Sequence, residues 1–313
     1  MPESGRQTEV TNERSVVLLT GASGYVGGRL LPLLEQQPVK VRCLVRTPDK
    51  LRRLAGQGTE IVQGDVLEPA TLDEALRGVQ TAYYLVHLMS GSTDFEEQDR
   101  QAAMNFAQAA ARAGVSRMIY LGGLGDDDDP KLSPHLRSRH EVGEILRSSG
   151  VETIEFRAGM VIGAGSLSYQ LMKSLTDRLP VMLCPRWLTT PTQPIAVDDV
   201  VAYLLAARTA HVDGSQTYEI GGADVVSYGD LIREYARQRN LRRWLISVPV
   251  LTPYLSSLWL ALVTPASFEV GRHLIEGLKN PTVVRDARAL SLFSVRPMGV
   301  QEAIRRAIET AGE

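Results

Sequence analysis

The chain has 313 residues, 44% of them hydrophobic and 22% charged, with a formal net charge of -2 at pH 7. This composition is typical of a globular protein with one large domain or two intimate ones, and the near-neutral charge argues against a nucleic-acid-binding protein with a broad basic face. The two cysteines, Cys43 and Cys184, form neither a disulfide framework nor a zinc ligand set. We therefore expect no metal site and a reduced, cytoplasmic protein.

In the first half of the chain, strand patterns alternate with helix patterns. Residues 1–14 are polar, lack the apolar core of a signal peptide and are predicted to be a disordered tail. Short apolar, β-branched runs, typical of strands buried on both faces, lie at 15–20, 39–45, 60–62, 81–86 and 116–121. Apolar residues at helical spacing lie at 25–36, 51–55, 71–76 and 95–113. This alternation predicts an α/β fold, a Rossmann-type doubly wound parallel sheet with helices on both faces.

The second half has a looser pattern. A helix at 135–148 and a strand at 151–156 precede a proline-rich stretch, and later helices are predicted at 197–209, 228–237 and 300–310. We expect a Rossmann domain at 15–160 that binds the cofactor. A smaller C-terminal substrate-binding part would follow at 161–313, with segments around 194–222 returning to the Rossmann core.

Two further segments have a notable composition. Residues 126–129 are four consecutive aspartates, which predict a solvated loop rather than a cation site, because the acids repel one another and lack the spacing of a calcium loop. The stretch 245–265 is the most apolar, but Pro249 and Pro253 leave it shorter than the roughly 20 residues that a membrane span needs. A buried or pocket-lining helix is favoured there, and contact with a membrane surface is the alternative.

The strongest chemical signal is a glycine-rich turn between the first strand and the first helix. Gly21 permits a tight turn, Gly24 lets the backbone approach a pyrophosphate, and Gly27 lets the helix pack closely on the sheet. The free N–H groups at the start of the helix then bind phosphate oxygens. The predicted phosphate-binding residues are Gly21, Ser23, Gly24, Tyr25, Val26 and Gly27.

The spacing G-x-x-G-x-x-G resembles the short-chain dehydrogenase/reductase superfamily in its extended and atypical branches. The segments 64–66 (GDV), 194–200 (PIAVDDV) and 217–222 (TYEIGG) also carry the resemblance. The segments 83–87 (YYLVH) and 120–125 (YLGGLG) make the chain most similar to the NmrA-like, NAD(P)H-binding branch. The resemblance implies an acidic residue, here Asp65, against the adenine ring. The other cofactor contacts expected at strand ends are Val66, Val86 and His87.

Arg46, at the end of the second strand, favours NADP(H). An enzyme that prefers NAD usually has a carboxylate at this position for the ribose hydroxyls, whereas an arginine pairs with a 2′-phosphate. The alternative is that Arg46 is simply an exposed residue at a strand end. Because Asp49 lies close enough in the chain to reach a ribose, NAD(H) stays possible.

The resemblance implies a catalytic Ser, Tyr and Lys, which this chain lacks. Gly122 and Gly123 stand where serine is expected, His135 replaces the tyrosine, and Arg139 replaces the lysine, where it is a candidate for contact with ribose or phosphate. His87 is the preferred site residue, because ligands in such folds lie at the carboxyl ends of the strands. His135 and Tyr169 are further candidate proton donors, although His135 can equally be an exposed residue at a helix start.

The predicted function is an NADPH-dependent oxidoreductase without the usual triad. It would transfer a hydride to the C=O or conjugated C=C of a small, largely apolar substrate. The expected pocket residues are Met160, Leu167, Met172, Leu183, Trp187 and the 245–265 segment, with Cys184 beside them. The alternative is a non-catalytic NADP(H)-binding sensor or a structural or assembly module. A sugar-nucleotide epimerase is disfavoured, because such enzymes usually retain the Tyr–Lys pair. The oligomeric state stays open.

Overall fold

The computed structural model describes residues 14–88, 95–184, 186–248 and 278–312. A seven-stranded sheet forms its centre, and every neighbouring pair of strands in it is parallel. From one edge to the other the strands are β11 (Gln216–Ile220), β6 (Glu152–Ala158), β5 (Arg117–Gly123), β4 (Val79–Tyr84), β1 (Val16–Thr20), β2 (Lys40–Val45) and β3 (Glu60–Gln63). The order 3-2-1-4-5-6 is that of a dinucleotide-binding sheet, which confirms the predicted Rossmann-type fold.

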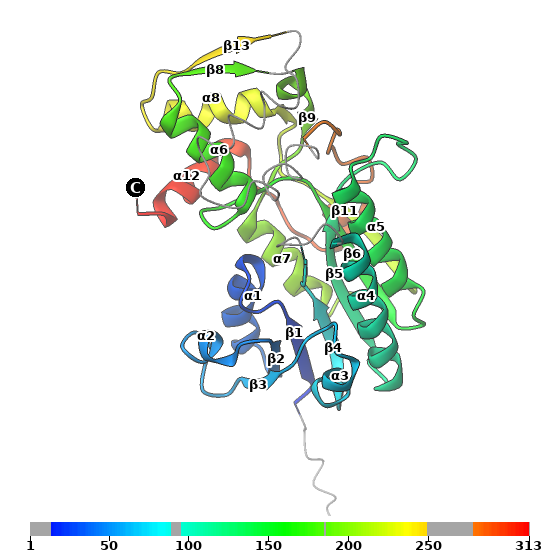
Figure 1. The fold of residues 1–313 in the computed structure, drawn as a ribbon. Coiled ribbons are helices and arrows are strands. Elements are labelled where there is room, and N and C mark those ends of the chain that lie inside the picture. Colours follow the sequence, from blue (N-terminus) through cyan, green and yellow to red (C-terminus); the bar gives the residue numbers. More distant parts are fainter. Residues whose placement is uncertain (1–13, 89–94, 185, 249–277, 313) are drawn as a thin grey trace, which may run out of the picture.

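Helices cover both faces of this sheet (Figure 1). One face carries α1 (Tyr25–Glu35), α2 (Pro48–Arg52), α7 (Val197–Ala207) and α11 (Arg288–Leu292), and the other carries α3 (Pro69–Leu76), α4 (Phe95–Arg112) and α5 (Pro134–Arg147). Successive side chains of a strand point to opposite faces. Accordingly Val17 and Leu19 pack under α1 and α7, whereas Leu18 packs under α3 and α4.

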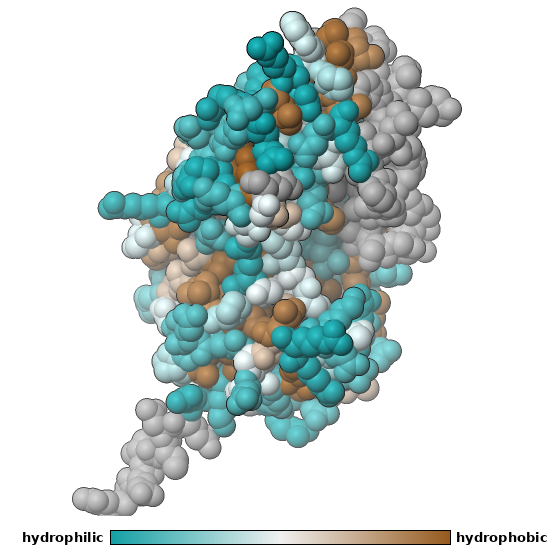
Figure 2. Space-filling view, turned by 90° about the vertical axis from the view of Figure 1, so that its left-hand side faces the viewer, coloured by the Kyte–Doolittle hydropathy of each residue, from teal (hydrophilic) through white to brown (hydrophobic). Residues whose placement is uncertain are grey.

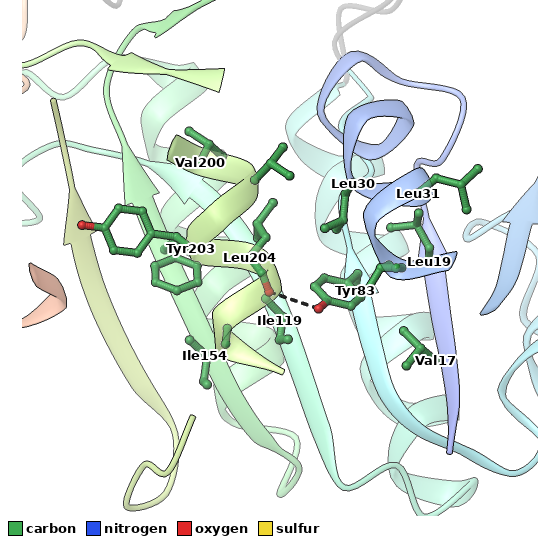
Figure 3. Packing of buried hydrophobic residues seen from close by; sticks show 14 of the residues in the cluster. Val17, Leu19, Leu30, Leu31, Tyr83, Ile119, Ile154, Val200, Tyr203 and Leu204 are labelled. Carbon is green, nitrogen blue, oxygen red and sulfur yellow. Dashed lines mark hydrogen bonds between the residues drawn. The ribbon is translucent and has the colours of Figure 1, made fainter. Parts of the chain in front are cut away.

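The face under α1 and α7 contains a buried hydrogen bond between distant elements (Figure 3). Tyr83 of β4 is fully buried among Leu19, Leu30 and Ile119, and its hydroxyl donates to the carbonyl of Leu204 in α7 at 3.0 Å. Burial raises the Tyr83 pKa far above its ordinary value, so the hydroxyl keeps its proton. The bond fixes α7 above the centre of the sheet.

Two short helices begin earlier than the sequence pattern predicts. Both α2 and α3 have a proline in their first turn, a position that proline favours because its fixed φ suits a helix and its missing N–H is not needed there. Glu68, not Thr71, is the N-cap of α3. The Thr71 hydroxyl instead donates to the carbonyls of Asp65 and Glu68, which braces the turn after β3.

A smaller group of elements lies beside the sheet, at the top of Figure 1. Its helices are α6 (Leu167–Arg178), α8 (Tyr228–Gln238) and α12 (Val300–Thr310), and they share one apolar cluster. Its short strands are β7 (Val161–Ile162), β8 (Val181–Cys184), β9 (Pro191–Thr192), β10 (Ile195–Ala196), β12 (Val226–Ser227) and β13 (Trp244–Ser247), with a 3-10 helix at Arg186–Thr189. The looser sequence pattern did not indicate α6 or these strand pairs.

The start of the apolar 245–265 stretch is a strand, because β13 pairs in parallel with β8. The rest of the stretch lies outside the described residues, as does the tail at 1–13. Alternation along this pair leaves Val181, Leu183, Trp244 and Ile246 exposed. Figure 2 shows a mainly hydrophilic face, with hydrophobic side chains gathered at its upper end, where β8 and β13 lie. Among the described residues, no helix combines the length and apolar character needed to span a bilayer.

Candidate functional site

The glycine-rich turn has the geometry of a phosphate site. Gly21 has a φ of +71°, and the Gly24 N–H donates to the Gly21 carbonyl at 2.9 Å. No side chain caps the start of α1, and its first turn carries no acid, so its N–H groups are free for an anion. A Cβ on Gly27 would lie 2.2 Å from the Gly21 carbonyl oxygen. Gly27 is therefore required by the turn itself rather than by the sheet.

A cleft of about 250 Å³ opens beside this turn. The ends of β1, β2, β3 and β4 meet there, as expected for ligand sites at the carboxyl ends of parallel strands. Its walls are Thr20, Gly21, Ser23, Gly24, Leu44, Val45, Arg46, Gly64, Asp65, Val66, Leu85, Val86, His87 and Leu88. The fold therefore brings together eight of the predicted cofactor residues, namely Gly21, Ser23, Gly24, Arg46, Asp65, Val66, Val86 and His87.

Tyr25 and Val26 do not line the cleft. The Tyr25 ring packs against the loop before α6, where a Cβ on Gly163 would lie 2.2 Å from its hydroxyl oxygen and one on Gly165 would lie 2.4 Å from its ring. Val26 packs on the core. No pattern in the sequence indicates that Tyr25 joins the turn to this later loop.

At the rim of the cleft, the carboxylates of Asp49 and Asp65 interact with neighbouring residues that the structure describes, whereas the guanidinium of Arg46 does not. Arg46 is exposed, and its guanidinium makes no hydrogen bond or ion pair with any described residue. Asp49 instead pairs with Arg52 at 3.5 Å, so it is not directed at a ribose. One Asp65 carboxylate oxygen accepts from the Leu67 N–H at 3.0 Å. Arg46 is thus the free cation of this rim within the described chain.

A second cavity of about 220 Å³ adjoins the cleft, and His87 lines both. Its walls combine the ends of β5 and β6 with residues of α5, α6 and α8. They are His87, Leu121, Gly122, Gly123, Leu124, His135, Leu136, Arg139, Ala158, Gly159, Met160, Val161, Ser168, Tyr228, Leu278 and Thr282. The second cavity is therefore built jointly by the sheet and the smaller group of elements.

Packing explains why glycines stand at 122 and 123. A Cβ on Gly123 would lie 2.6 Å from a methyl carbon of Leu136, and one on Gly122 would lie 3.0 Å from a carboxylate oxygen of Glu155. A serine at 123 would require the Leu136 side chain to shift, and one at 122 would require the Glu155 side chain to shift.

Arg139 lies at the floor of the second cavity and is largely buried. Its guanidinium donates to the carbonyls of Leu121 and, at 3.5 Å, Val86, and it stacks on the Tyr120 ring at 4.8 Å from the centroid. It therefore links the ends of β4 and β5. This leaves fewer donors for a ribose or phosphate than the sequence suggested.

His87 is held by a buried carboxylate. Its Nδ1 lies 3.1 Å from Oδ2 of Asp99, a residue of α4 that is 2% exposed. The Asp99 carboxylate also accepts from the Leu88 N–H at 3.0 Å and from the Ser138 hydroxyl at 3.1 Å. The His87 and His135 ring centroids are 5.0 Å apart. Asp99 was not among the predicted site residues, although its spacing from Ala102, Ala103 and Phe106 places it on the buried face of α4.

The fold does not bring Tyr169 into this group. Tyr169 is 1% exposed in the apolar cluster of α6, α8 and α12, with its ring edge-on to Tyr235 at 6.0 Å, and it lines neither cavity. Cys184 is buried in the same cluster, and burial raises the pKa of its thiol. Of the apolar pocket residues predicted, Met160 lines the second cavity, whereas Leu167 and Leu183 are exposed and Met172 is in the cluster.

The acidic run at 126–129 is paired, not merely solvated. Asp126 pairs with Arg285 at 2.7 Å, and Asp127 pairs with Arg157 at 2.7 Å and with His140 at 2.5 Å. The segment is a loop in which Asp127 and Asp128 are exposed, as predicted, but side chains from β6, α5 and the C-terminal region also hold it.

The comparisons with known proteins agree with this geometry. A family model described as NAD(P)H-binding matches residues 21–178. The chain is 27% identical to the ceramide reductase of Caulobacter vibrioides over 84% of each protein. It is also 27% identical to the (4-alkanoyl-5-oxo-2,5-dihydrofuran-3-yl)methyl phosphate reductase of Streptomyces griseus, over 71% of the chain and 73% of that relative. The NADPH-dependent quinone oxidoreductase QOR2 of Escherichia coli, solved with NADPH, has the same fold, with a TM-score of 0.73, 20% identity and coverage of 93% and 99%.

Proposed function

Because the chain belongs to the NAD(P)H-binding family, we propose that it is an NADPH-dependent oxidoreductase that reduces the C=O or conjugated C=C of a small, largely apolar molecule. The reductase names of its relatives support this reaction class. The observation that carries the proposal is that His87 lines both cavities. This arrangement places a cleft suited to a dinucleotide beside a space for a second molecule.

The residues of the cleft fit a dinucleotide. The N–H groups at the start of α1 would hold the pyrophosphate, Asp65 and Val66 would flank the adenosine end, and the Arg46 guanidinium would pair with a 2′-phosphate. When bound, the reduced nicotinamide supplies the hydride. The protein supplies orientation.

The second cavity supports an apolar substrate. Leu121, Leu124, Leu136 and Met160 line it. Its polar side chains are those of His87, His135, Arg139, Ser168, Tyr228 and Thr282. A relative named for the reduction of ceramide, a lipid, is consistent with this lining. We assign substrate binding to the part at 161–313, whose described residues Ser168 and Tyr228 close the cavity.

A non-catalytic NADP(H)-binding module is the second candidate. The observation that favours it is the packing at Gly122 and Gly123, which leaves no room for the expected serine without rearrangement. Such a protein would gain stability from NADPH, by RT ln(1 + [L]/Kd), without consuming it.

Turnover distinguishes these candidates. Purified protein should oxidise NADPH in the presence of at least one member of a panel of apolar aldehydes, ketones, quinones and enones. Tight NADPH binding with no oxidation across the panel would favour the non-catalytic module.

Arg46 provides the test of cofactor preference. Replacing Arg46 by Ala should weaken NADPH binding by about 10- to 100-fold, because a charged hydrogen-bonded pair with the 2′-phosphate is lost, and should leave NADH binding within about twofold. Nicotinamide fluorescence titrations measure both. Arg53→Ala is the matched control, since Arg53 is an exposed arginine of the same region that does not line the cleft. An unchanged NADPH preference in Arg46→Ala would remove Arg46 from the site.

A further inference from the structure

Three hydrogen bonds determine which nitrogen of His87 carries its proton. Asp99 accepts from the Leu88 N–H, from the Ser138 hydroxyl and at His87 Nδ1. Although burial opposes ionisation, the hydrogen bond and charge of His87 and the charge of Arg139 keep the Asp99 pKa below its ordinary value. Asp99 is thus an ionised acceptor, so the neutral His87 ring carries its hydrogen on Nδ1 and a lone pair on Nε2.

The surroundings of the His87 Nε2 atom differ from those of Nδ1. Nε2 is buried and has no hydrogen-bond partner among the described residues. A buried polar atom without a partner is costly unless a ligand or a water satisfies it. The ring lies at the border of the two cavities, where the dinucleotide cleft meets the space for a second molecule. Its Nδ1 side is occupied by Asp99, so Nε2 is the ring nitrogen that has no protein partner in the described chain.

We propose that Nε2 of His87 transfers the proton in the reaction of this site and that Asp99, assisted by Ser138, is a positioning residue that holds the ring in the Nδ1–H form. This inference rests on the proposed function and deepens it. In enzymes with the full triad a tyrosine transfers this proton. Here the proposal assigns the transfer to a His–Asp pair, in which the histidine follows β4 and the aspartate belongs to α4.

With a carbonyl substrate, the carbon receives a hydride and the oxygen receives a proton. As the carbonyl carbon gains a hydride, the C=O π electrons move to oxygen. The Nε2–H bond of the His87 imidazolium breaks, the O–H bond of the alcohol forms, and the ring is left neutral. The ring regains its proton from solvent. In the reverse direction the neutral Nε2 removes the alcohol proton. Two electrons come from the dinucleotide of the proposed function.

The charged and titratable groups around the ring set the pH dependence. Asp99 of α4 favours the imidazolium, whereas burial and Arg139 of α5 disfavour it, and the His87 pKa is lowered overall. The His135 imidazole of α5 faces the same ring. A lowered pKa keeps His87 neutral at pH 7. Reduction should therefore speed up as the pH falls toward this pKa, and alcohol oxidation should be favoured at neutral and higher pH.

The first experiment determines the tautomer directly, without turnover. Nitrogen-15 NMR of the histidines in the full chain, with the His87 signals assigned from a His87→Gln variant, should show hydrogen on Nδ1 and none on Nε2 at neutral pH. In Asp99→Asn the amide can donate to Nδ1, so the hydrogen should move to Nε2. A wild-type ring with hydrogen on Nε2 would overturn the proposal, and this result does not depend on whether a substrate is known.

The second experiment follows NADPH oxidation with 9,10-phenanthrenequinone and with cinnamaldehyde as probes, across pH. His87→Gln should lose about 100-fold or more in kcat, together with the rise toward low pH. Asp99→Asn should shift or flatten the pH profile, an effect that a purely structural role would not produce. The matched control is His140→Gln, because His140 is also paired with an aspartate but lines neither cavity.

The outcomes separate the two hypotheses. If wild-type protein fails to bind or oxidise NADPH, the proposed function fails, and the tautomer measurement alone decides the placement of the His87 proton. If wild-type protein turns over and His87→Gln keeps both the rate and the pH profile, the His–Asp proposal is overturned while the reductase function stands. If His87→Gln does not fold, the pH profile of Asp99→Asn provides the same test.

Discussion

Gly24 and Gly28 are close neighbours with different surroundings. A Cβ on Gly24 would lie 3.1 Å from the Gly21 carbonyl oxygen, and Gly24 also lines the cleft. A Cβ on Gly28 would lie 3.4 Å from the Ala22 carbonyl oxygen, an ordinary contact, and Gly28 does not line the cleft. Gly24 therefore has both a close backbone contact and a place in the cleft wall, whereas Gly28 has neither.

Replacing each of these glycines by alanine tests this difference. Gly24→Ala should fold with a small loss of stability, of about 1 kcal/mol, and should weaken NADPH binding strongly because the methyl group enters the space for the pyrophosphate. Gly28→Ala should keep both stability and binding. Thermal unfolding with and without NADPH measures the two effects together. Equal NADPH affinity in the two variants would place the pyrophosphate elsewhere.

At the level of elements, β6 carries a carboxylate that has no exposure. Glu155 pairs with Arg157 at 2.9 Å and with Arg147 of α5, and it accepts from the Thr217 hydroxyl of β11 at 3.1 Å. A Cβ on Gly143 would lie 2.5 Å from this carboxylate, so α5 approaches β6 closely there. The carboxylate thus joins β6, β11 and α5 at the edge of the sheet that borders the second cavity.

Removing that charge should be costly. Glu155→Gln removes the anion that the two guanidinium groups share, although Arg157 keeps Asp127 and Arg147 keeps Glu144. We therefore expect a loss of about 1.5–3 kcal/mol in the free energy of unfolding. Glu152→Gln, on the same strand, is the control. Its partner Arg117 keeps hydrogen bonds to the carbonyls of Ala207 and Ala210, so the loss should be about 1 kcal/mol or less. Urea unfolding compares them, and equal losses would contradict a special role of the buried carboxylate.

Across the protein, one buried histidine, His140, and one half-buried histidine, His87, couple stability to pH. Burial lowers the pKa of His140 below its ordinary value of 6.5, and Arg157 adds to this effect, while Asp127 and the Gly123 carbonyl oppose it. His87 shifts in the same direction. Between each lowered folded-state pKa and 6.5, the unfolded chain binds more protons than the folded one. The stability that the neutral rings contribute is thus complete above about 6.5 and is lost as the pH falls below it.

The free energy of unfolding should accordingly drop between about pH 7.5 and about pH 5.5 before most carboxylates titrate. Urea denaturation at both pH values measures this drop. His140→Gln should reduce the drop, because one of the two protonation sites is removed. His211→Gln should not change it, since His211 is exposed on the surface. A drop that is the same in all three proteins would assign the pH dependence to other groups.

Much of the sheet and the glycine turn were predictable from the chain alone. The strands of the main sheet from β1 to β6 begin and end within two residues of the predicted positions, because their apolar runs reflect burial on both faces, a local property of sequence. Gly21, Gly24 and Gly27 indicated the turn in the same way, since a positive φ or a close backbone approach restricts a position to glycine whatever the rest of the fold does.

Contacts between distant segments were decided only by the tertiary structure. His87 and Asp99 are 12 residues apart in the chain, and no local pattern shows that α4 turns this acid toward the end of β4. The same holds for Tyr25 against Gly163 and for Asp127 against Arg157. Periodicity shows which face of a helix or strand is buried, but the residues that contact this face depend on how all the elements pack. The chemistry of this site depends on such contacts between distant segments, so the sequence pattern alone does not indicate it.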